Sequence, residues 1–241
     1  MKNLIAAIQF ITIIPMGKSG KFDPEKMIPF FPVVGIILGL MLALLDQIFL
    51  LLWSKPVASL LDVLFLIIIT GALHLDGLGD TADGLYGRRT KKKALSIMKD
   101  SRIGAMGIVA IICGLSVKWA GIIGLDEYRS LLLIIIPAYA RGSILFGIRF
   151  LEYGRSDDGT GKPFFEKKLG ITDFCWLLIP VLLSVLLGFK AILLNFVFLI
   201  IIYGIHLFYK KKIGCITGDM LGAMVEITEA GLFLFASIQL L

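Results

Sequence analysis

The sequence is poor in charged residues and has no cysteine pattern, and each absence excludes a class of protein. Asp, Glu, Lys and Arg make up only 17% of the 241 residues, whereas 58% are hydrophobic and the mean hydropathy is +0.92. Soluble domains contain roughly 45–50% apolar residues, so a water-soluble protein is excluded. Cys113, Cys175 and Cys215 stand apart, without C-x-x-C or C-x-x-H spacing, which argues against a disulfide framework and against a zinc site.

The chain also lacks a nucleic-acid-binding pattern and a signal-peptide cleavage site. Its net charge of +6 comes without a basic stripe interleaved with aromatic residues, so we expect no nucleic-acid partner. The apolar segment at residues 4–15 has no small-residue cleavage site and is followed by Lys18, Lys21 and Lys26. We therefore expect no cleavage. Because so short a segment cannot span a bilayer, we expect it to lie in the interface or to re-enter.

Long apolar runs recur along the chain and are typical of membrane-spanning helices. They predict an all-α fold, a polytopic integral membrane helical bundle with about seven transmembrane helices. The expected spans are residues 30–52, 57–74, 103–124, 130–150, 172–188, 191–209 and 221–240. Without an internal repeat or a long soluble stretch, we expect a single membrane domain over residues 1–241, with the lipid bilayer as a partner. The sequence leaves open whether copies of the chain form a homo-oligomer.

Basic residues gather in alternate loops and predict the orientation of the bundle. Most of the 24 Lys and Arg residues fall in four loops, at residues 1–29, 75–102, 151–171 and 210–219. The loops on the other side hold only Lys55, Arg129 and Lys190. By the positive-inside rule, we expect a protein of the cytoplasmic membrane with the N-terminus and the four basic loops in the cytoplasm and the C-terminus outside.

Three carboxylates follow the second apolar run, in the segment HLDGLGDTADG at residues 74–84. Asp76, Asp80 and Asp83 stand at i, i+4 and i+7, a spacing that puts them on one face of a helix. Three such anions repel one another unless a cation lies among them, and carboxylate oxygens favour Mg²⁺, Mn²⁺ or Ca²⁺. We therefore predict a metal site here rather than a solvated acidic loop. His74 is either an interface residue or a catalytic group.

Other polar residues are expected at the same cytoplasmic end of the bundle. They are Lys99 and Arg102 before the third span, Arg141 within the fourth, and Thr217 and Asp219 before the seventh. Sequence-distant groups that converge on one face are what a single active site needs. Acids that hold a divalent metal beside arginines and lysines indicate transfer of a phosphate-containing group. The spacing does not name the substrate.

Glu226 is predicted to lie roughly 10 Å into the bilayer, from the 1.5 Å rise per helical residue. A bare carboxylate at that depth costs around 3 kcal/mol or more. Glu226 must therefore face a wet cavity, bind a cation, or pair with Arg141 or Lys118. Two hypotheses stay open, a structural ion pair and a residue that lines the substrate cavity.

Five segments along the chain carry a family resemblance. They are FITIIP at residues 10–15, FPVVG at 31–35, HLDGLGDTADG at 74–84, IMKDSRIG at 97–104 and TGDMLGAMVE at 217–226. In this order and spacing they resemble the cobalamin-5'-phosphate synthase family, also called adenosylcobinamide-GDP ribazoletransferases. Two places depart from it. Ile13 stands where family members often carry Arg, and residues 153–161, which include Arg155, match only loosely.

The resemblance implies the last step in assembling the lower nucleotide loop of a cobalamin. α-Ribazole or its 5'-phosphate attacks the cobinamide-linked phosphate of adenosylcobinamide-GDP, GMP leaves, and adenosylcobalamin or its 5'-phosphate forms. The family requires Mg²⁺ and is integral to the cytoplasmic membrane, with its active site facing the cytoplasm.

The resemblance also implies roles for residues of this sequence. The implied metal ligands are Asp76, Asp80, Asp83 and Asp219. The implied substrate-binding residues are Lys99, Arg102, Arg141, Thr217 and Glu226. The implied catalytic residues are Asp80, Asp83 and His74, and the general base is left open between His74 and an aspartate.

Two other classes of membrane protein fit the sequence less well. A CDP-alcohol phosphotransferase would also place aspartates on membrane helices, but its motif needs an Ala-Arg pair and a Gly-x₃-Asp-x₃-Asp half. Here Asp76 and Gly77 are followed by Leu78-Gly79-Asp80. A transporter would show paired broken helices and related halves, and neither is visible in the sequence.

Overall fold

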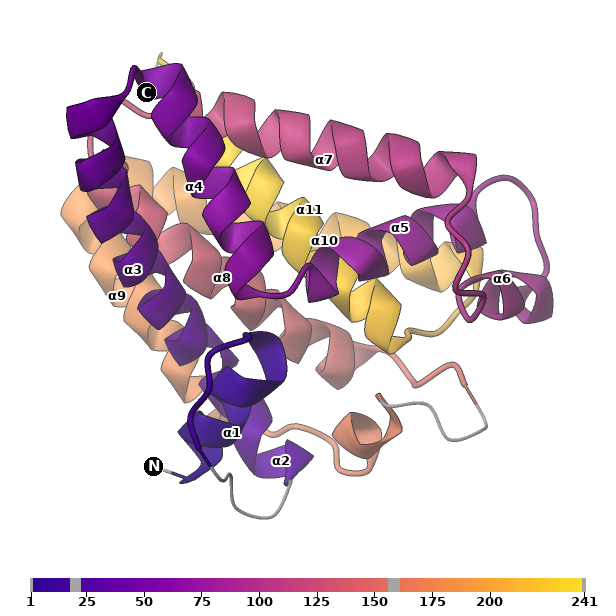
Figure 1. Cartoon of the computed structure of the whole chain (residues 1–241). Helices are drawn as coiled ribbons and strands as arrows, with labels where there is room; N and C mark the ends of the chain where they lie inside the picture. The colour runs from indigo at the N-terminus through magenta and orange to yellow at the C-terminus, as the bar shows by residue number, and fades with distance from the viewer. Residues whose placement is uncertain (1, 18–22, 156–160, 240–241) are drawn as a thin grey trace.

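The computed structural model describes residues 2–17, 23–155 and 161–239, and within these ranges the fold is all-α, as predicted (Figure 1). The helical elements are α1 (Lys2–Ile11), α2 (Pro24–Met27), η1 (Ile28–Phe30), α3 (Phe31–Leu52), α4 (Lys55–Ile69), α5 (Leu73–Leu85), α6 (Lys91–Ile97), α7 (Ala105–Ile123), α8 (Arg129–Phe150), η2 (Lys162–Phe165), η3 (Ile171–Leu177), α9 (Leu178–Ser184), η4 (Val185–Leu187), α10 (Phe189–Lys212) and α11 (Gly218–Ala236). The pairing of extended backbone in the described ranges is limited to one isolated parallel bridge between Tyr153 and Ile216.

The chain is a membrane protein, but the predicted count of seven spans is not confirmed. Among the described residues, four helical runs are long and apolar enough to cross a membrane: Pro24–Leu52, Ala105–Ile123, Arg129–Phe150 and Phe189–Lys212. The helices α4 and α5 meet the same criterion only as a pair bent by 88°, which gives a fifth span if the pair counts as one.

Three predicted spans differ from the structure, each for its own reason. The span at 57–74 is broken because Gly71 and Ala72, both with φ of 57°, turn the chain from α4 into α5. The span at 172–188 becomes a short run, Ile171–Leu187, that mixes 3₁₀- and α-helix. The last one, α11, carries three carboxylates in its 19 residues, which is too many for a helix that faces lipid.

α8 lies at the centre of the bundle, because 83% of its apolar stretch is buried, against 22% for α7 and 28% for α10. α3 packs on it backbone to backbone through two glycines. A Cβ on Gly35 would lie 2.5 Å from the oxygen of Pro137, and one on Gly39 would lie 2.3 Å from the oxygen of Ile134. Small residues at such crossings are typical of helix packing in membranes.

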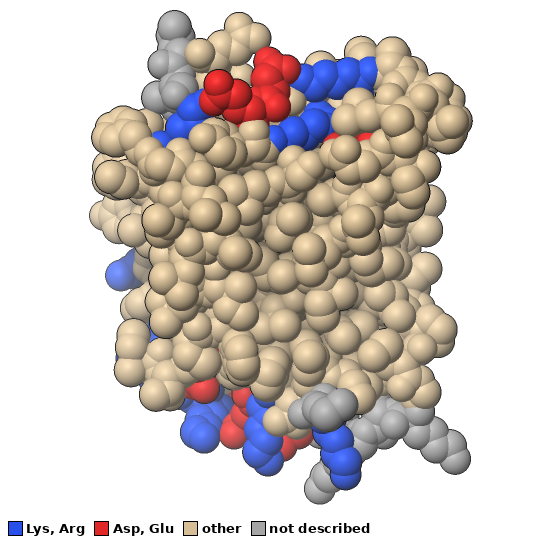
Figure 2. Space-filling model, turned by 90° about the vertical axis from the view of Figure 1, so that its left-hand side faces the viewer, with Lys and Arg blue, Asp and Glu red and all other residues tan. Residues whose placement is uncertain are grey.

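On the face that Figure 2 shows, charged side chains lie at the two ends of the bundle, and the band between them is almost entirely uncharged. One end holds α1 and α2, and the opposite end holds the start of α4 and the C-terminus (Figure 1). Apolar surface of this kind faces the hydrocarbon of a bilayer, whereas charge at both ends faces water.

Arg129, the first residue of α8, ties α3 and α4 together from a buried position. Its guanidinium contacts Asp46 at distances of 2.7 to 3.1 Å, Asp62 at 3.0 Å and Ser59 at 3.0 Å. Arg129 is 8% exposed, and both carboxylates are fully buried. The sequence placed Arg129 in a loop, so its burial corrects that expectation. We call these four residues the Arg129 cluster.

The Arg129 cluster predicts a stability defect. Arg129→Met leaves Asp46 and Asp62 buried without their cation, which costs about 3–5 kcal/mol when one partner of a buried pair is lost. We expect a clear drop in the thermal unfolding temperature, measured by circular dichroism in detergent. The matched control is Lys55→Met, which removes an ion pair whose side chains are 32% and 67% exposed and costs about 0–1 kcal/mol. Equal shifts in the two variants would contradict the assignment.

Candidate active site

The candidate active site forms where α5 crosses α11 with almost no space between the two backbones. A Cβ on Gly77 of α5 would lie 2.5 Å from the backbone oxygen of Asp219, and one on Gly222 of α11 would lie 3.2 Å from the Cα of His74. The first distance leaves no room for any side chain, and the second leaves little. The two glycines therefore let α5 bring its acids against the start of α11.

Asp76, Asp80 and Asp219 form what we call the carboxylate group. Asp80 lies within electrostatic reach of both Asp76 and Asp219. Arg155 Nη2 lies 2.6 Å from Asp219 Oδ2, and the Thr217 hydroxyl donates to the same oxygen at 3.3 Å. Burial raises the pKa of Asp219, at the first turn of α11, and the Arg155 guanidinium opposes the shift. Among the described residues, these three acids thus have one positively charged neighbour, Arg155, which leaves negative charge in excess.

Asp83 is engaged elsewhere, because its carboxylate holds the first turn of α7. Oδ2 accepts a hydrogen bond from the Gly104 amide at 2.6 Å, and Oδ1 accepts one from the Gly107 amide at 2.9 Å. A Cβ on either glycine would lie within 2.5 Å of this carboxylate. Asp83 therefore joins the segment at residues 74–84 to the one at 97–104. Its metal-binding and catalytic roles stay predictions.

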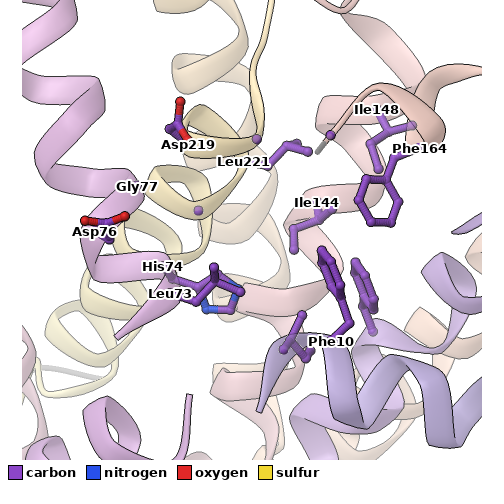
Figure 3. Close-up of a pocket in the computed structure, with 15 residues that line it drawn as sticks. Phe10, Leu73, His74, Asp76, Gly77, Ile144, Ile148, Phe164, Asp219 and Leu221 are labelled. Carbon is purple, nitrogen blue, oxygen red and sulfur yellow. The ribbon is translucent and has the colours of Figure 1, made fainter. Parts of the chain in front are cut away.

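A cavity of about 130 Å³ opens beside the carboxylate group. It lies between α1, α3, α5, α8, η2 and α11 and has two unlike walls. Figure 3 shows Asp76 and Asp219 on one side and Phe10, Ile144 and Phe164 on the other. The cavity can therefore hold a ligand that is polar at one end and apolar at the other.

His74 borders the same cavity and is only 3% exposed. In the part of the chain that the structure describes, its Nδ1 is buried and has no hydrogen-bond partner. Buried polar atoms without a partner are uncommon in folded proteins. A histidine that borders a cavity and has an unpaired ring nitrogen favours the functional alternative for His74.

Four charged residues form a buried charge network that joins α7, α8 and α11. Lys118 Nζ lies 2.6 Å from Glu226 Oε2 and 2.7 Å from Glu229 Oε2, and Arg141 Nη1 pairs with Glu229 Oε1. All four side chains are at most 9% exposed, and their formal charges cancel. Glu226 is thus paired with Lys118, one of the two partners expected for it. Contact of Arg141 and Glu226 with a substrate stays a prediction.

Lys99 and Arg102 are not among the residues that line the cavity. Arg102 pairs with Asp100 at 2.6 Å, and its side chain is 86% exposed. This hydrogen-bonded partner lowers the pKa of Asp100 to about 2. Arg102 also lines a surface groove together with Asp83 and Arg89. Lys99 is exposed, so neither of these two predicted residues is part of the cavity wall.

Sequence reasoning missed the apolar wall of the cavity and Lys118's second partner. Phe10 and Phe31 belong to segments that carry the family resemblance, which is the one signal that could have indicated them. The helical spacing of Glu226 and Glu229 puts both on one face, but nothing in the sequence pattern indicated that Glu229 contacts Lys118 or that Phe164 lines the cavity. Their positions depend on contacts between distant helices.

The carboxylates of the candidate site suit a hard divalent cation by their chemistry. Within the described ranges, no three His, Cys, Asp or Glu side chains are arranged to hold a metal ion. Mg²⁺, however, usually binds through one or two carboxylates, water and substrate phosphates rather than a protein cage. The carboxylate oxygens of Asp76, Asp80 and Asp219 fit that mode.

The fold and the site define an integral membrane protein with an acidic, ring-lined cavity inside its helical bundle. The family model described as cobalamin-5-phosphate synthase matches residues 3–237. The chain belongs to that family, as the five segments of the sequence indicated.

Curated relatives carry the name adenosylcobinamide-GDP ribazoletransferase. The protein of Alkaliphilus metalliredigens is 38% identical and covers 98% of this chain and 94% of its own length. That of Clostridioides difficile is 37% identical, covering 95% of this chain and 94% of itself. That of Caldanaerobacter subterraneus is 32% identical, covering 99% and 98%. No solved structure matches this chain significantly.

The crossing of α5 and α11 predicts that a single methyl group disturbs the site. Gly77→Ala places its Cβ 2.5 Å from a backbone oxygen, so the two helices must separate. We expect a lower unfolding temperature by circular dichroism. The control is Gly204→Ala on α10, where nothing lies within 4 Å of the new Cβ and helix propensity gains about 0.5–1 kcal/mol. A Gly77→Ala protein as stable as the Gly204→Ala protein would contradict the close crossing.

Proposed function

We propose that the chain is a membrane transferase that joins α-ribazole, or its 5'-phosphate, to the cobinamide phosphate of adenosylcobinamide-GDP. Membership in the family over residues 3–237 supports this reaction, and so does the name that the relatives carry, adenosylcobinamide-GDP ribazoletransferase. The observation that carries the proposal is the carboxylate group beside a cavity, formed by the segments 74–84 and 217–226.

In the proposed reaction, a hydroxyl oxygen of the acceptor forms a bond to the phosphorus that bears the cobinamide. The bond from that phosphorus to the bridging oxygen breaks, and GMP leaves with this oxygen. The hydroxyl proton passes to a base. We propose His74 for this role, since the residue borders the cavity and its buried Nδ1 has no hydrogen-bond partner among the described residues. An aspartate of the carboxylate group is the alternative base.

We further propose that Asp76, Asp80 and Asp219 hold Mg²⁺. When bound, the ion would neutralise charge on the pyrophosphate and on the departing GMP. Arg155 is already paired with Asp219 and is the cation best placed to contact a phosphate there. Asp83, with both oxygens on amides of α7, would fix the position of that helix relative to α5.

The assay for the function measures GMP release from adenosylcobinamide-GDP by protein in lipid nanodiscs, with α-ribazole and Mg²⁺. Asp80→Asn removes one charge of the carboxylate group, and we expect turnover to fall by about 10²-fold or more, as for loss of a group needed in the transition state. Glu127→Gln is the control, since Glu127 is 72% exposed and paired with Lys190. It should retain full activity.

Two outcomes would count against the proposal. Near-normal GMP release by a folded Asp80→Asn protein would overturn the metal site. Release of CMP from a CDP-alcohol, with no GMP from the corrinoid donor, would instead identify a CDP-alcohol phosphotransferase.

We also propose that the N-terminus and the active site face the cytoplasm, on the basis of the positive-inside rule. In a cysteine-free background, Asp126→Cys should react with a membrane-impermeant maleimide in intact cells. Lys167→Cys, whose parent side chain is 73% exposed, should react only after the cells are permeabilised. The reverse labelling pattern would show the opposite orientation.

A further inference from the structure

The apolar wall of the cavity is made of side chains that four separate elements bring together. Phe10 comes from α1, Phe31 from α3, Phe164 from η2, and Ile144 and Ile148 from α8. We call these five residues the ring wall. The rings of Phe10 and Phe31 are parallel within 1° with centroids 6.1 Å apart, and those of Phe10 and Phe164 are 5.0 Å apart at 60°. Aromatic faces and edges of this kind favour a planar aromatic ligand.

The size of the cavity decides which part of the proposed substrates it can hold. Its volume is about 130 Å³, and an apolar cavity of ~150 Å³ is known to bind benzene. A corrin macrocycle with its side chains is many times larger than this space. Three flat bases in the substrates approach it in size: the donor's guanine and adenine and the acceptor's benzimidazole. The two purines carry exocyclic amino groups that an apolar wall would leave without partners, so the benzimidazole fits the ring wall best.

We infer that the ring wall binds the flat base of the acceptor nucleoside, the benzimidazole of α-ribazole or of its 5'-phosphate. This inference rests on the proposed function and adds its specificity-determining residues. The polar wall supports it, because Asp76 and Asp219 lie on the side opposite Phe10 and Phe164 (Figure 3). A nucleoside whose base contacts the ring wall directs its ribose away from that wall and toward the carboxylates, where the new bond to phosphorus forms.

His74 gives an independent indication of a ligand in this cavity. It borders the cavity, is 3% exposed, and has a buried Nδ1 with no hydrogen-bond partner in the described ranges. An apolar occupant such as a lipid chain would leave this nitrogen unsatisfied. The ribose of a nucleoside bound as inferred carries hydroxyl groups that can hydrogen-bond with it.

The first experiment measures the kinetic constants for each of the two substrates in variants of the ring wall. Phe164→Leu keeps an apolar side chain and removes the aromatic face, and Phe10→Leu does the same on the other side of the wall. We expect the KM for α-ribazole to rise about tenfold or more, the range reported for loss of one base–aromatic stack. The kcat and the KM for adenosylcobinamide-GDP should stay close to wild type. The control is Phe196→Leu on α10, whose side chain is 60% exposed and which should change none of these values.

The second experiment measures binding without turnover. Wild-type protein in nanodiscs is titrated with α-ribazole by calorimetry, in the absence of donor and of Mg²⁺. We expect saturable binding that is weakened about tenfold in Phe164→Leu and unchanged in Phe196→Leu, with unfolding temperatures showing that both variants fold. This arm does not depend on catalysis, so a wild-type protein that binds α-ribazole but releases no GMP would overturn the proposed function and leave the inference intact.

Three results would overturn the inference. An unchanged KM and affinity for α-ribazole in folded Phe164→Leu would show that the ring wall does not contact the base. A raised KM for adenosylcobinamide-GDP alone would assign the wall to the donor. Loss of α-ribazole binding on raising the phospholipid content of the nanodiscs, equal in both variants, would assign the cavity to an acyl chain.

Discussion

The bilayer core holds no water, so each charge that these helices bury needs a partner inside the protein. This constraint accounts for the Arg129 cluster at one end of the bundle and for the buried charge network between α7, α8 and α11. In the network, positive and negative charges cancel. The carboxylate group differs from it in that three acids lie near one arginine, and two of them, Asp76 and Asp219, border a cavity. Excess negative charge is thus placed where a cation or a ligand can reach it.

The carboxylate-bearing helix α5 is fixed by contacts of different chemical kinds. Gly77 lets its backbone touch that of α11, and Asp83 accepts two amide hydrogen bonds from the start of α7. His74 lies beside the buried charge network. Because these contacts are short and involve backbone atoms, α5 has little freedom to shift. Asp76 and Asp80 therefore stand on a rigid support, as a site that must place phosphate groups requires.

The sequence predicted the helical membrane class, and it predicted that Asp76 and Asp80 lie on one face of a helix. Both predictions depend on local pattern. It placed Asp83 on the same acidic face, but helix spacing does not show that a second helix end will capture a carboxylate. Hydropathy likewise counted seven spans. It does not register the left-handed turn at Gly71 and Ala72, the mixed 3₁₀- and α-helix of Ile171–Leu187, or the three carboxylates that keep α11 from facing lipid. The sequence named Lys118 and Arg141 as possible partners of Glu226, but the choice of Lys118, 108 positions away, depends on tertiary packing. The assembly of the ring wall from four elements is likewise a tertiary event that no local pattern contains.

The 88° turn between α4 and α5 has a consequence for how the acids meet their ligand. Residues four apart on a helix are separated by about 6 Å along its axis. Because α5 runs across the direction of α4, Asp76 and Asp80 follow one another across α4 rather than along it. A ligand that meets both acids must therefore extend along α5, an arrangement that a straight continuation of α4 would not offer.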